Sequence, residues 1–300
     1  MKVLLTGSNG QVGWEVSRQA STHGVTLIAT DRQSFDIASP DAAAIIIADD
    51  IDCVINAAAY TAVDRAESEP DAARAANASG PAALAARCRE LGIPLIHLST
   101  DYVFDGTATR PYRESDATAP MGVYGHTKLE GEEAVRAATD QHVILRTSWV
   151  FGVHGNNFVK TMLRLAAERD ELRVVADQIG CPTFAGSIAH AALAIATDPS
   201  PRFGTFHFCG TGPTTWHTLA SHVVDQAARI GLIQSAPAVT PISTRDFPTP
   251  AARPAYSVLD TSEFEASYPD IPVGEWINGV QHVLDASHQS THQSEQGINP

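Results

Sequence analysis

The segment KVLLTGSNGQVG, residues 2–13, decides the fold. It begins with a short apolar run, KVLLT, which is typical of a buried strand. Glycines follow in a GxxGxxG pattern at Gly7, Gly10 and Gly13. A strand that runs through such a loop into a helix uses glycine for the tight turn, for close approach of a pyrophosphate and for helix packing. The segment therefore predicts a dinucleotide-binding loop, contributed by Gly7, Asn9, Gly10, Gln11 and Val12.

Beyond this segment, apolar runs alternate with stretches of helical length. The apolar runs are Lys2–Thr6, Thr26–Thr30, Cys53–Asn56, Leu95–Ser99 and His142–Arg146. The predicted helices are Gln11–His23, Asp71–Leu91 and Tyr124–Ala138. Near-continuous apolar strands separated by helices indicate a parallel sheet covered on both faces. We therefore predict an α/β fold with a doubly wound, Rossmann-like parallel sheet over residues 1–150.

After about Val150 this rhythm changes. Helices are predicted at Phe158–Glu168, Ser187–Ala196 and Thr215–Ile230, and a strand at Thr205–Cys209. We predict a smaller α/β substrate-binding lobe over residues 151–286, with some later segments returning to the main sheet. Residues 287–300 are polar, and we expect a flexible tail whose histidines are solvated rather than metal-bound.

Composition excludes several classes of protein. The chain has 300 residues, 44% of them hydrophobic, and a formal net charge of −14. This acidity argues against general binding to nucleic acid or to an anionic membrane. Its apolar runs are far shorter than the roughly 18 residues of a membrane span. The start lacks signal-peptide features, and the four cysteines show no CxxC spacing. We therefore expect a cytoplasmic protein without disulfides.

Two neighbouring residues bear on the choice of cofactor. Asp31 closes the second predicted strand, and an acidic residue there accepts hydrogen bonds from ribose hydroxyls, which favours NAD. Arg32 lies beside it and would meet a 2′-phosphate, which favours NADP. The expected cofactor is therefore NADH or NADPH.

Further cofactor contacts are expected where later strands end. Asp36 and Ile37 either flank the adenine or cap a helix. The small residues after the third strand would let the cofactor cross the carboxyl edge of the sheet, where open α/β folds bind ligands. The predicted contacts there are Asn56, Ala57, Ala58, Ala59 and Tyr60.

A phenol and an ammonium group lie four residues apart, on one face of a predicted helix, at Tyr124 and Lys128. A free tyrosine titrates near 10, and a nearby cation stabilises its phenolate. Ser99 and Thr100 end the fourth strand, where a hydroxyl can bind a carbonyl oxygen that is becoming an alkoxide. We predict Thr100, Tyr124 and Lys128 as the catalytic residues of a carbonyl reduction, with Ser99, Tyr124 and Lys128 also contacting the cofactor.

With these motifs in place, the sequence resembles the extended short-chain dehydrogenase/reductase family. Within it, the chain is similar to the dTDP-4-dehydrorhamnose reductases. The similar blocks are STDYVFDG (99–106), YGHTKL (124–129), RTSWV (146–150), GNNF (155–158), TAVDRAE (61–67) and PTPAARP (248–254). The resemblance implies hydride transfer from NADH or NADPH to C4 of dTDP-4-dehydro-6-deoxy-L-mannose, which gives dTDP-L-rhamnose. Tyr124 would donate the proton, Lys128 would lower the Tyr124 pKa and hold the nicotinamide ribose, and Thr100 would polarise the carbonyl.

The resemblance also implies a set of substrate contacts. Trp149 either closes over nicotinamide and sugar or packs in the core. Arg253, in a proline-rich loop, is expected to hold the dTDP diphosphate. The full set is Thr100, Asp101, Tyr102, Phe104, Asp105, Trp149, Asn156 and Arg253.

Reductases of this type can share a magnesium ion between two subunits through glutamates. Glu15 matches the first of these, but the block 180–187, GCPTFAGS, holds no acidic residue. We therefore assign no metal ligands, regard Mg²⁺ as doubtful, and expect a monomer or a weak homodimer.

Two other functions fit parts of the pattern. A nucleotide-sugar epimerase or dehydratase shares the glycine loop and the Tyr-Lys pair, but dehydratases generally need an acidic pair where Thr100-Asp101 supplies one carboxylate. A non-catalytic regulatory relative would be marked by loss of Tyr124 or Lys128, and both are present.

Overall fold

The computed structural model describes residues 1–39 and 50–296. Its centre is a six-stranded sheet in the order β10-β5-β4-β3-β1-β2. Every neighbouring pair of strands is parallel. The strands are β1 (Lys2–Thr6), β2 (Thr26–Thr30), β3 (Cys53–Asn56), β4 (Leu95–Thr100), β5 (His142–Thr147) and β10 (Gly204–His207). The predicted doubly wound parallel sheet is therefore confirmed.

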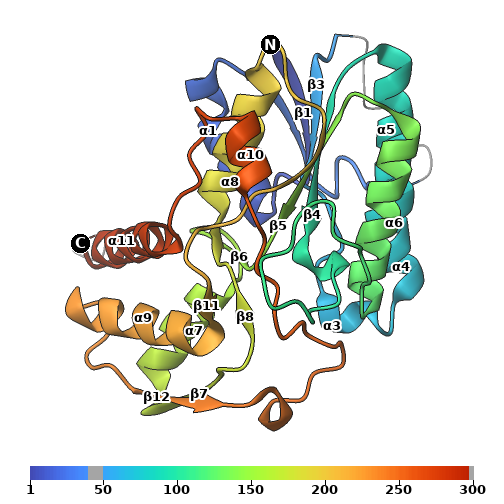
Figure 1. Cartoon of the computed structure of the whole chain (residues 1–300). Helices are drawn as coiled ribbons and strands as arrows, with labels where there is room; N and C mark the ends of the chain where they lie inside the picture. Colours follow the sequence, from blue (N-terminus) through green and yellow to red (C-terminus); the bar gives the residue numbers. More distant parts are fainter. Residues whose placement is uncertain (40–49, 297–300) are drawn as a thin grey trace.

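Alternate residues of the strands pack against helices on opposite faces. Val3 and Leu5 belong to one core cluster with α1 (Gln11–Gln19), α8 (Ala185–Thr197) and α10 (Ser262–Ser267). Leu4 belongs to another cluster with α5 (Gly80–Leu91) and α6 (Val123–Ala138). Figure 1 shows these two helical layers on either side of the sheet. Burial on both faces explains why the strands are almost wholly apolar.

Two predicted helices are divided. The helix predicted over Gln11–His23 consists of α1 followed by the 3₁₀ turn η1 (Ala20–His23). The helix predicted over Asp71–Leu91 consists of α4 (Pro70–Arg74), the π-helical turn η2 (Ala75–Ser79) and α5. Within η2, the Asn77 side chain bonds both backbone groups of Tyr60 and the Thr127 hydroxyl, so tertiary contacts hold the wider turn.

A second lobe has its own core. It contains α7 (Phe158–Glu168), α9 (Trp216–Arg229), α11 (Trp276–Gln296) and the parallel pair β7 (Glu171–Val175) and β12 (Ala238–Ile242). Short ladders lie between this lobe and the main sheet: β6 (Val150–Phe151) with β9 (Thr183–Phe184), and β8 (Ile179–Gly180) with β11 (Thr214–Thr215). Meanwhile β10 and α8 join the main sheet layer. Helix α11 continues to Gln296, whereas an irregular segment was expected from Ser287; residues 297–300 lie outside the described residues.

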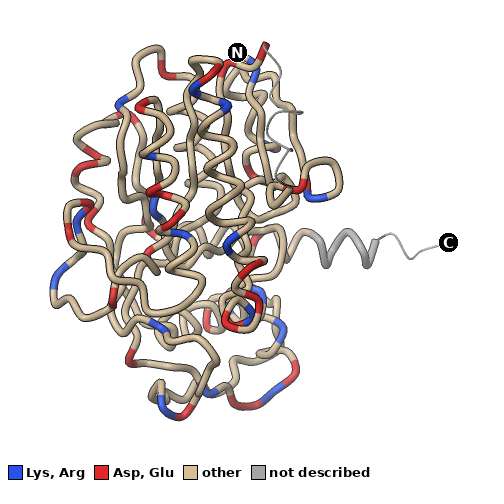
Figure 2. The backbone as a smooth tube through the Cα atoms, turned by 90° about the vertical axis from the view of Figure 1, so that its right-hand side faces the viewer, with Lys and Arg blue, Asp and Glu red and all other residues tan. Residues whose placement is uncertain are grey.

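The remaining elements are short and carry site loops. They are α3 (Val63–Ala66) and the 3₁₀ turns η3 (Asp101–Val103) and η4 (Thr244–Asp246). Among the described helices, none is long and apolar enough to cross a membrane. Figure 2 shows basic and acidic residues interspersed over both lobes, without a concentrated basic face.

Close packing at the glycine loop requires the absence of a side chain at Gly13. A Cβ placed there would lie 2.1 Å from the Gly7 carbonyl oxygen and 2.8 Å from Ser8 Cα. Both neighbours are backbone atoms, so the loop itself would have to move.

We predict that Gly13→Ala lowers the free energy of unfolding by about 1–3 kcal/mol, the usual cost of overpacking. Urea denaturation measures the change. Gly274→Ala is the matched control, because a Cβ at Gly274 meets nothing within 4 Å. Equal stability of the Gly13 variant and the wild type would contradict the close approach.

Candidate active site

The site lies at the carboxyl edge of the sheet. Strands β1 and β3 are hydrogen-bonded neighbours, and the chain winds outward from them in opposite directions, to β2 and to β4. Such a reversal opens a crevice outside the carboxyl ends of the strands, which is where open α/β sheets bind ligands.

The glycine loop connects β1 to α1 at this crevice. Gly7 has φ 74°, and its carbonyl accepts a hydrogen bond from Gly10 N at 3.0 Å. Gly10 is the N-cap residue directly before α1, and no side chain caps this helix end. Asn9 and Gly10 are exposed, while Val12 is buried beneath the loop. Open amide donors at a helix N-terminus fit the pyrophosphate of a dinucleotide.

Asp31 and Arg32 end β2 beside this loop. Asp31 accepts hydrogen bonds from Asn9 Nδ2 at 2.9 Å and from the Ser34 backbone and hydroxyl, and these bonds hold its pKa below the ordinary value. Arg32 is highly exposed and pairs with Asp36 at 3.6 Å. Asp36 also closes a local turn through Ala38 N, and Ile37 is buried.

Asn56 differs from its predicted role, because its side chain is bonded inside the protein. It is fully buried, accepts hydrogen bonds from the Thr6 hydroxyl at 2.6 Å and from Ala58 N, and its amide lies 2.9 Å from His97 Nδ1. The half-buried Ala57, Ala58 and Ala59 follow at the edge. The Tyr60 hydroxyl donates to Glu69 at 2.6 Å.

Helix α6 presents Tyr124 and Lys128 toward the end of β4. The Tyr124 phenol lies next to the Thr100 hydroxyl, which works to lower the phenol's pKa, and its ring meets Tyr102 edge-on at 5.4 Å. Burial and the Asp101 charge together raise the pKa of Tyr124 to about 12. Lys128 Nζ donates to the Leu98 carbonyl at 2.7 Å, and burial lowers its pKa to about 8 while the Glu132 carboxylate opposes this.

These values differ from the expectation that Lys128 brings the Tyr124 pKa down. Burial outweighs the other influences on the phenol, and the ammonium group is bonded to a strand carbonyl. At neutral pH the phenol therefore carries its proton, as a proton donor must.

A buried ionic network below this pair was not predicted. Glu132 is fully buried and accepts from the Ser99 hydroxyl at 2.5 Å and from Arg146 Nε and Nη2 at 2.9 and 2.7 Å. Arg136 adds a third donor group at 3.1 Å. The Ser99 hydroxyl therefore donates its hydrogen bond to Glu132, although we had expected Ser99 to contact the cofactor. Glu132 follows Lys128 by four residues and Tyr124 by eight, which places all three on one helical face. This spacing was the sequence signal that could have identified Glu132.

Asp101 lies against the catalytic hydroxyls. Its Oδ1 accepts from Thr100 Oγ1 at 3.0 Å, and it is almost fully buried. Burial raises its pKa to about 6, and the nearby Ser257 and Thr100 hydroxyls oppose the rise. This carboxyl group therefore titrates close to neutral pH beside Tyr124.

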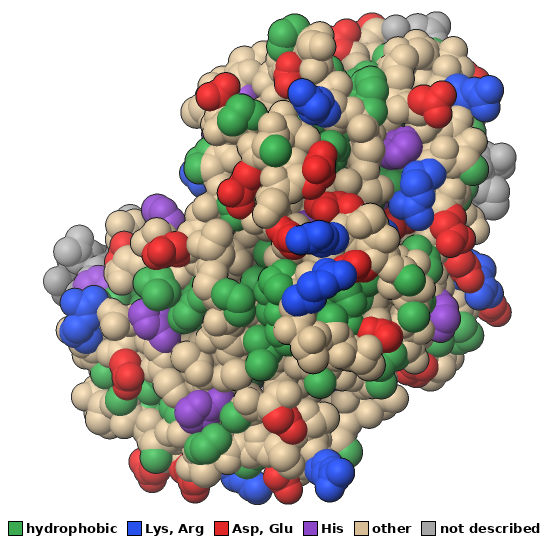
Figure 3. All heavy atoms as spheres, in the orientation of Figure 1, with side chains coloured by type: hydrophobic (Ala, Val, Ile, Leu, Met, Phe, Trp, Pro, Cys, Tyr) green, Lys and Arg blue, Asp and Glu red, His purple; other side chains and the backbone are tan. Residues whose placement is uncertain are grey.

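A cavity of about 430 Å³ lies next to these residues and is lined by both lobes. Tyr102, Trp149 and Arg253 of the predicted substrate set line it. Arg253 Nη2 pairs with Asp64 at 2.8 Å, and Nη1 is buried without a partner among the described residues. An unpartnered guanidinium nitrogen at a cavity wall suits an anionic ligand. Figure 3 shows hydrophobic side chains gathered where the lobes meet, with basic side chains beside them.

Three predicted substrate residues lie elsewhere. Phe104 is 1% exposed and stacks on Tyr112 at 4.3 Å, within a core cluster. Asp105 accepts a hydrogen bond from the Tyr112 hydroxyl at 2.7 Å. Asn156 is exposed, and its neighbour Asn157 instead caps α7 and bonds Gln11 Oε1 at 3.0 Å.

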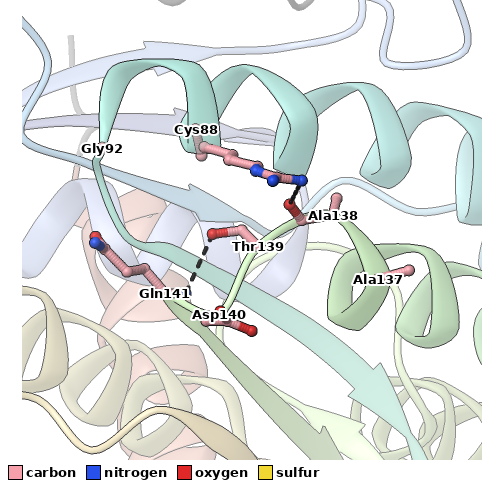
Figure 4. A pocket seen from close by; sticks show the side chains of 8 residues that line it. Cys88, Gly92, Ala137, Ala138, Thr139, Asp140 and Gln141 are labelled. Carbon is pink, nitrogen blue, oxygen red and sulfur yellow. Dashed lines mark hydrogen bonds between the residues drawn. The ribbon is translucent and has the colours of Figure 1, made fainter.

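A second cavity, of about 340 Å³, lies at the opposite edge of the sheet. Figure 4 shows its wall, formed by the end of α5 and the connection from α6 to β5, including Cys88, Ala138 and Gln141. Arg89 crosses it to the Ala138 carbonyl at 3.4 Å. It lies at the amino ends of the strands, away from the ligand-binding crevice.

Glu15 is the residue that matches the magnesium-site glutamates. Its buried Oε2 accepts from Arg18 at 2.8 Å and Gln19 at 3.2 Å, whereas Oε1 has no partner among the described residues. Gln19 also donates to the Gly186 carbonyl. No group of three or more potential metal ligands occurs in residues 1–39 and 50–296 of one subunit, so one subunit alone offers fewer oxygen ligands than Mg²⁺ takes.

A protonated phenol at the carboxyl edge of a parallel sheet with a glycine loop, packed on a residue that lines a cavity shared with a second lobe, is the arrangement of an extended short-chain dehydrogenase/reductase. The comparisons with known proteins narrow this class. The model of the RmlD substrate binding domain family matches residues 1–289. This chain belongs to that family, the dTDP-4-dehydrorhamnose reductases, as the resemblance predicted.

Individual relatives agree with this assignment. A dTDP-4-dehydrorhamnose reductase of Sinorhizobium fredii is 46% identical over 95% of this chain and 97% of its own length. The crystal structure of the Clostridium acetobutylicum reductase has a TM-score of 0.87 at 40% identity, covering 95% of this chain and 99% of that one. The Bacillus anthracis reductase, solved in complex with NADP, has a TM-score of 0.85 at 33% identity, covering 94% and 98%.

We predict that Glu132→Gln destabilises the protein by about 3–5 kcal/mol at pH 7, because Arg146 loses its buried counter-charge. Thermal or urea unfolding measures this. The paired environment lowers the pKa of Glu132 from its ordinary 4.5. Its stabilising contribution is therefore complete above about pH 4.5 and is lost as the pH falls through the lowered pKa.

The difference between the Glu132 variant and the wild type should accordingly shrink in acid. Glu168→Gln is the control, because its pair with Arg164 at 3.1 Å is solvent-exposed and should contribute less than about 1 kcal/mol. Equal effects of the two substitutions would contradict the buried network.

We predict that Asp31→Ala weakens NADH binding more than NADPH binding, and that Arg32→Ala does the reverse. Asp31 would bind ribose hydroxyls, whereas Arg32 would bind the 2′-phosphate. Fluorescence titration of both cofactors measures the two dissociation constants. Equal losses for both cofactors in each variant would show that neither side chain reaches the ribose.

Proposed function

We propose that this enzyme uses NADPH or NADH to reduce the C4 carbonyl of dTDP-4-dehydro-6-deoxy-L-mannose, which gives dTDP-L-rhamnose. The single observation that carries the proposal is the protonated Tyr124 phenol, which lies next to the Thr100 hydroxyl and packs on Tyr102, a residue of the cavity between the lobes. Family membership over residues 1–289 supports the nucleotide-sugar substrate.

The residues around this phenol have separate tasks. A nicotinamide bound at the glycine loop would supply the hydride that adds to C4. Tyr124 donates its proton to the oxygen that becomes the C4 hydroxyl, and Thr100 donates a hydrogen bond to the same oxygen as negative charge develops there. Lys128 is held by the Leu98 carbonyl, and the Glu132 charge favours its protonated form. It keeps a positive charge near the departing proton and would offer donors to the cofactor ribose.

The nucleotide part of the substrate would occupy the cavity that the second lobe closes. Arg253 is proposed to bind the diphosphate through its unpartnered Nη1, with Asp64 fixing the other end of the guanidinium. Trp149, Asp101 and Tyr102 would surround the sugar. Phe104 acts by packing behind this wall rather than by contact.

Both cofactors remain candidates. The complex of the Bacillus anthracis relative with NADP supports NADPH. The Asp31 side chain supports NADH as well, since its hydrogen bonds to Asn9 and Ser34 place a carboxylate at the end of β2.

The epimerase or dehydratase alternative is not favoured. Asp101 is a single carboxyl group beside Thr100, and 46% identity to a reductase spans nearly the whole chain. We also propose a cytoplasmic location, consistent with four buried, unpaired cysteines, and a monomer or weak homodimer that needs no bridging metal.

We predict that Tyr124→Phe lowers kcat by about 10²-fold or more, the usual size of a general-acid contribution, while NADPH still binds. NADPH oxidation with dTDP-4-dehydro-6-deoxy-L-mannose measures turnover. Tyr268→Phe is the control, because that phenol bonds the Arg202 carbonyl on the far helical layer. A fully active Tyr124 variant, or a wild type that retains bound NAD and interconverts sugars without net NADPH oxidation, would contradict the proposal.

A further inference from the structure

Trp149 has a backbone conformation that its side chain disfavours. Its φ is 46°, and no other non-glycine residue of the described chain has a positive φ. In this region the Cβ crowds the backbone, so bulky residues seldom adopt it. Such strain persists only where the surroundings fix the residue, and it concentrates at functional sites.

Trp149 and the residue before it are both hydrogen-bonded to the segment Cys181–Thr183, which lies between the main sheet and the second lobe. The Trp149 carbonyl accepts a hydrogen bond from Thr183 N at 3.2 Å. The preceding Ser148 donates its hydroxyl to the Cys181 carbonyl at 2.7 Å. Thr147, two residues earlier, is the register partner of the catalytic Thr100. Trp149 is thus tied to the catalytic strand end and to the second lobe.

The Trp149 ring, like its backbone, is held by neighbouring residues. It stacks on Trp216 with ring centroids 3.5 Å apart and an interplanar angle of 5°. Gly180 also lies against the ring, since a Cβ there would come within 2.5 Å of Trp149 Cε2. Only glycine leaves room for the indole at this position.

Trp216 is itself held in place. Its Nε1 donates to Gln178 Oε1 at 3.1 Å, and its ring packs on Phe158 at 4.6 Å. It begins α9 directly after β11, in which Thr214 pairs with Gly180 of β8. Of the two residues that hold the Trp149 indole, Gly180 therefore belongs to this small ladder and Trp216 directly follows it, between the sheet and the second lobe (Figure 1).

Both indoles line the shared cavity together with Tyr102 and Arg253. Because Trp216 occupies one face of the Trp149 ring, a substrate can meet Trp149 only on its remaining surface. The position of that surface relative to Tyr124 and Thr100 is then set from the second lobe.

Resting on the proposed reduction, we propose that Trp216 is a positioning residue for the nucleotide sugar. It fixes the strained Trp149 indole, and the indole in turn aligns the sugar carbonyl with Tyr124. Trp216 acts through Trp149 and does not touch the reacting atoms. Its loss should therefore affect the sugar substrate and leave cofactor binding intact.

The test compares Trp216→Ala, Trp216→Phe and Gly180→Ala. Trp216→Ala should lower kcat/KM for the sugar by up to about 10²-fold, the effect of a misplaced substrate, with an unchanged NADPH dissociation constant. Trp216→Phe keeps a stacking ring and should recover most of the activity. Gly180→Ala pushes the Trp149 ring away from residue 180 and should lower kcat/KM for the sugar as Trp216→Ala does. It therefore tests the inference even if Trp216→Ala does not fold.

Trp276→Phe is the matched control, because Trp276 lies in the same lobe and bonds the Gly212 carbonyl at 2.8 Å. Wild-type kcat and KM in both alanine variants, or equal damage in Trp216→Phe and Trp216→Ala, would overturn the inference. A wild type that does not oxidise NADPH would instead contradict the proposed reduction. Titration with dTDP-L-rhamnose, the proposed product, then decides the inference: Trp216→Ala should weaken its binding roughly tenfold, and unchanged binding would overturn it.

Discussion

The ion pair between Glu132 and Arg146 joins helix α6 to the ends of two adjacent strands. Glu132 also accepts the Ser99 hydroxyl, so β4, β5 and α6 meet at one fully buried carboxylate. A buried carboxylate is tolerated only when it is paired and hydrogen-bonded. Because Glu132 must reach both Ser99 and Arg146, the position of α6 along the strands is fixed. Two turns before Glu132 on the same face, Tyr124 is thereby brought to Thr100.

The same network acts on the protonation of Lys128, whereas burial dominates that of Tyr124. Burial alone favours a neutral lysine and a neutral tyrosine. The carboxylate of Glu132 works against this for Lys128, whose pKa is lowered only to about 8. Nothing comparable acts on Tyr124, whose pKa is raised to about 12. The result is a protonated phenol near an ammonium group, which is the state needed to give a proton to a carbonyl oxygen that is being reduced.

The sequence was sufficient for the sheet because strands buried on both faces are apolar throughout and separated by helices. It was also sufficient for Tyr124, Lys128 and Thr100, because helical spacing and strand ends place them on one edge. Spacing does not show which neighbour a side chain meets. Phe104 was assigned to the substrate although it packs behind the site, and Glu132 and Trp216 were overlooked because their roles depend on partners 14 and 67 residues away, Arg146 and Trp149.

The central claim is that this arrangement places a 4-keto sugar between Tyr124 and the cofactor for direct hydride transfer. Incubation with NADPH deuterated at nicotinamide C4 on the transferred face, followed by NMR of the product, tests it most directly. The account predicts one deuterium at C4 of dTDP-L-rhamnose and one NADP⁺ formed per product. Product without deuterium at C4, or a sugar isomer formed with no NADP⁺, would contradict it.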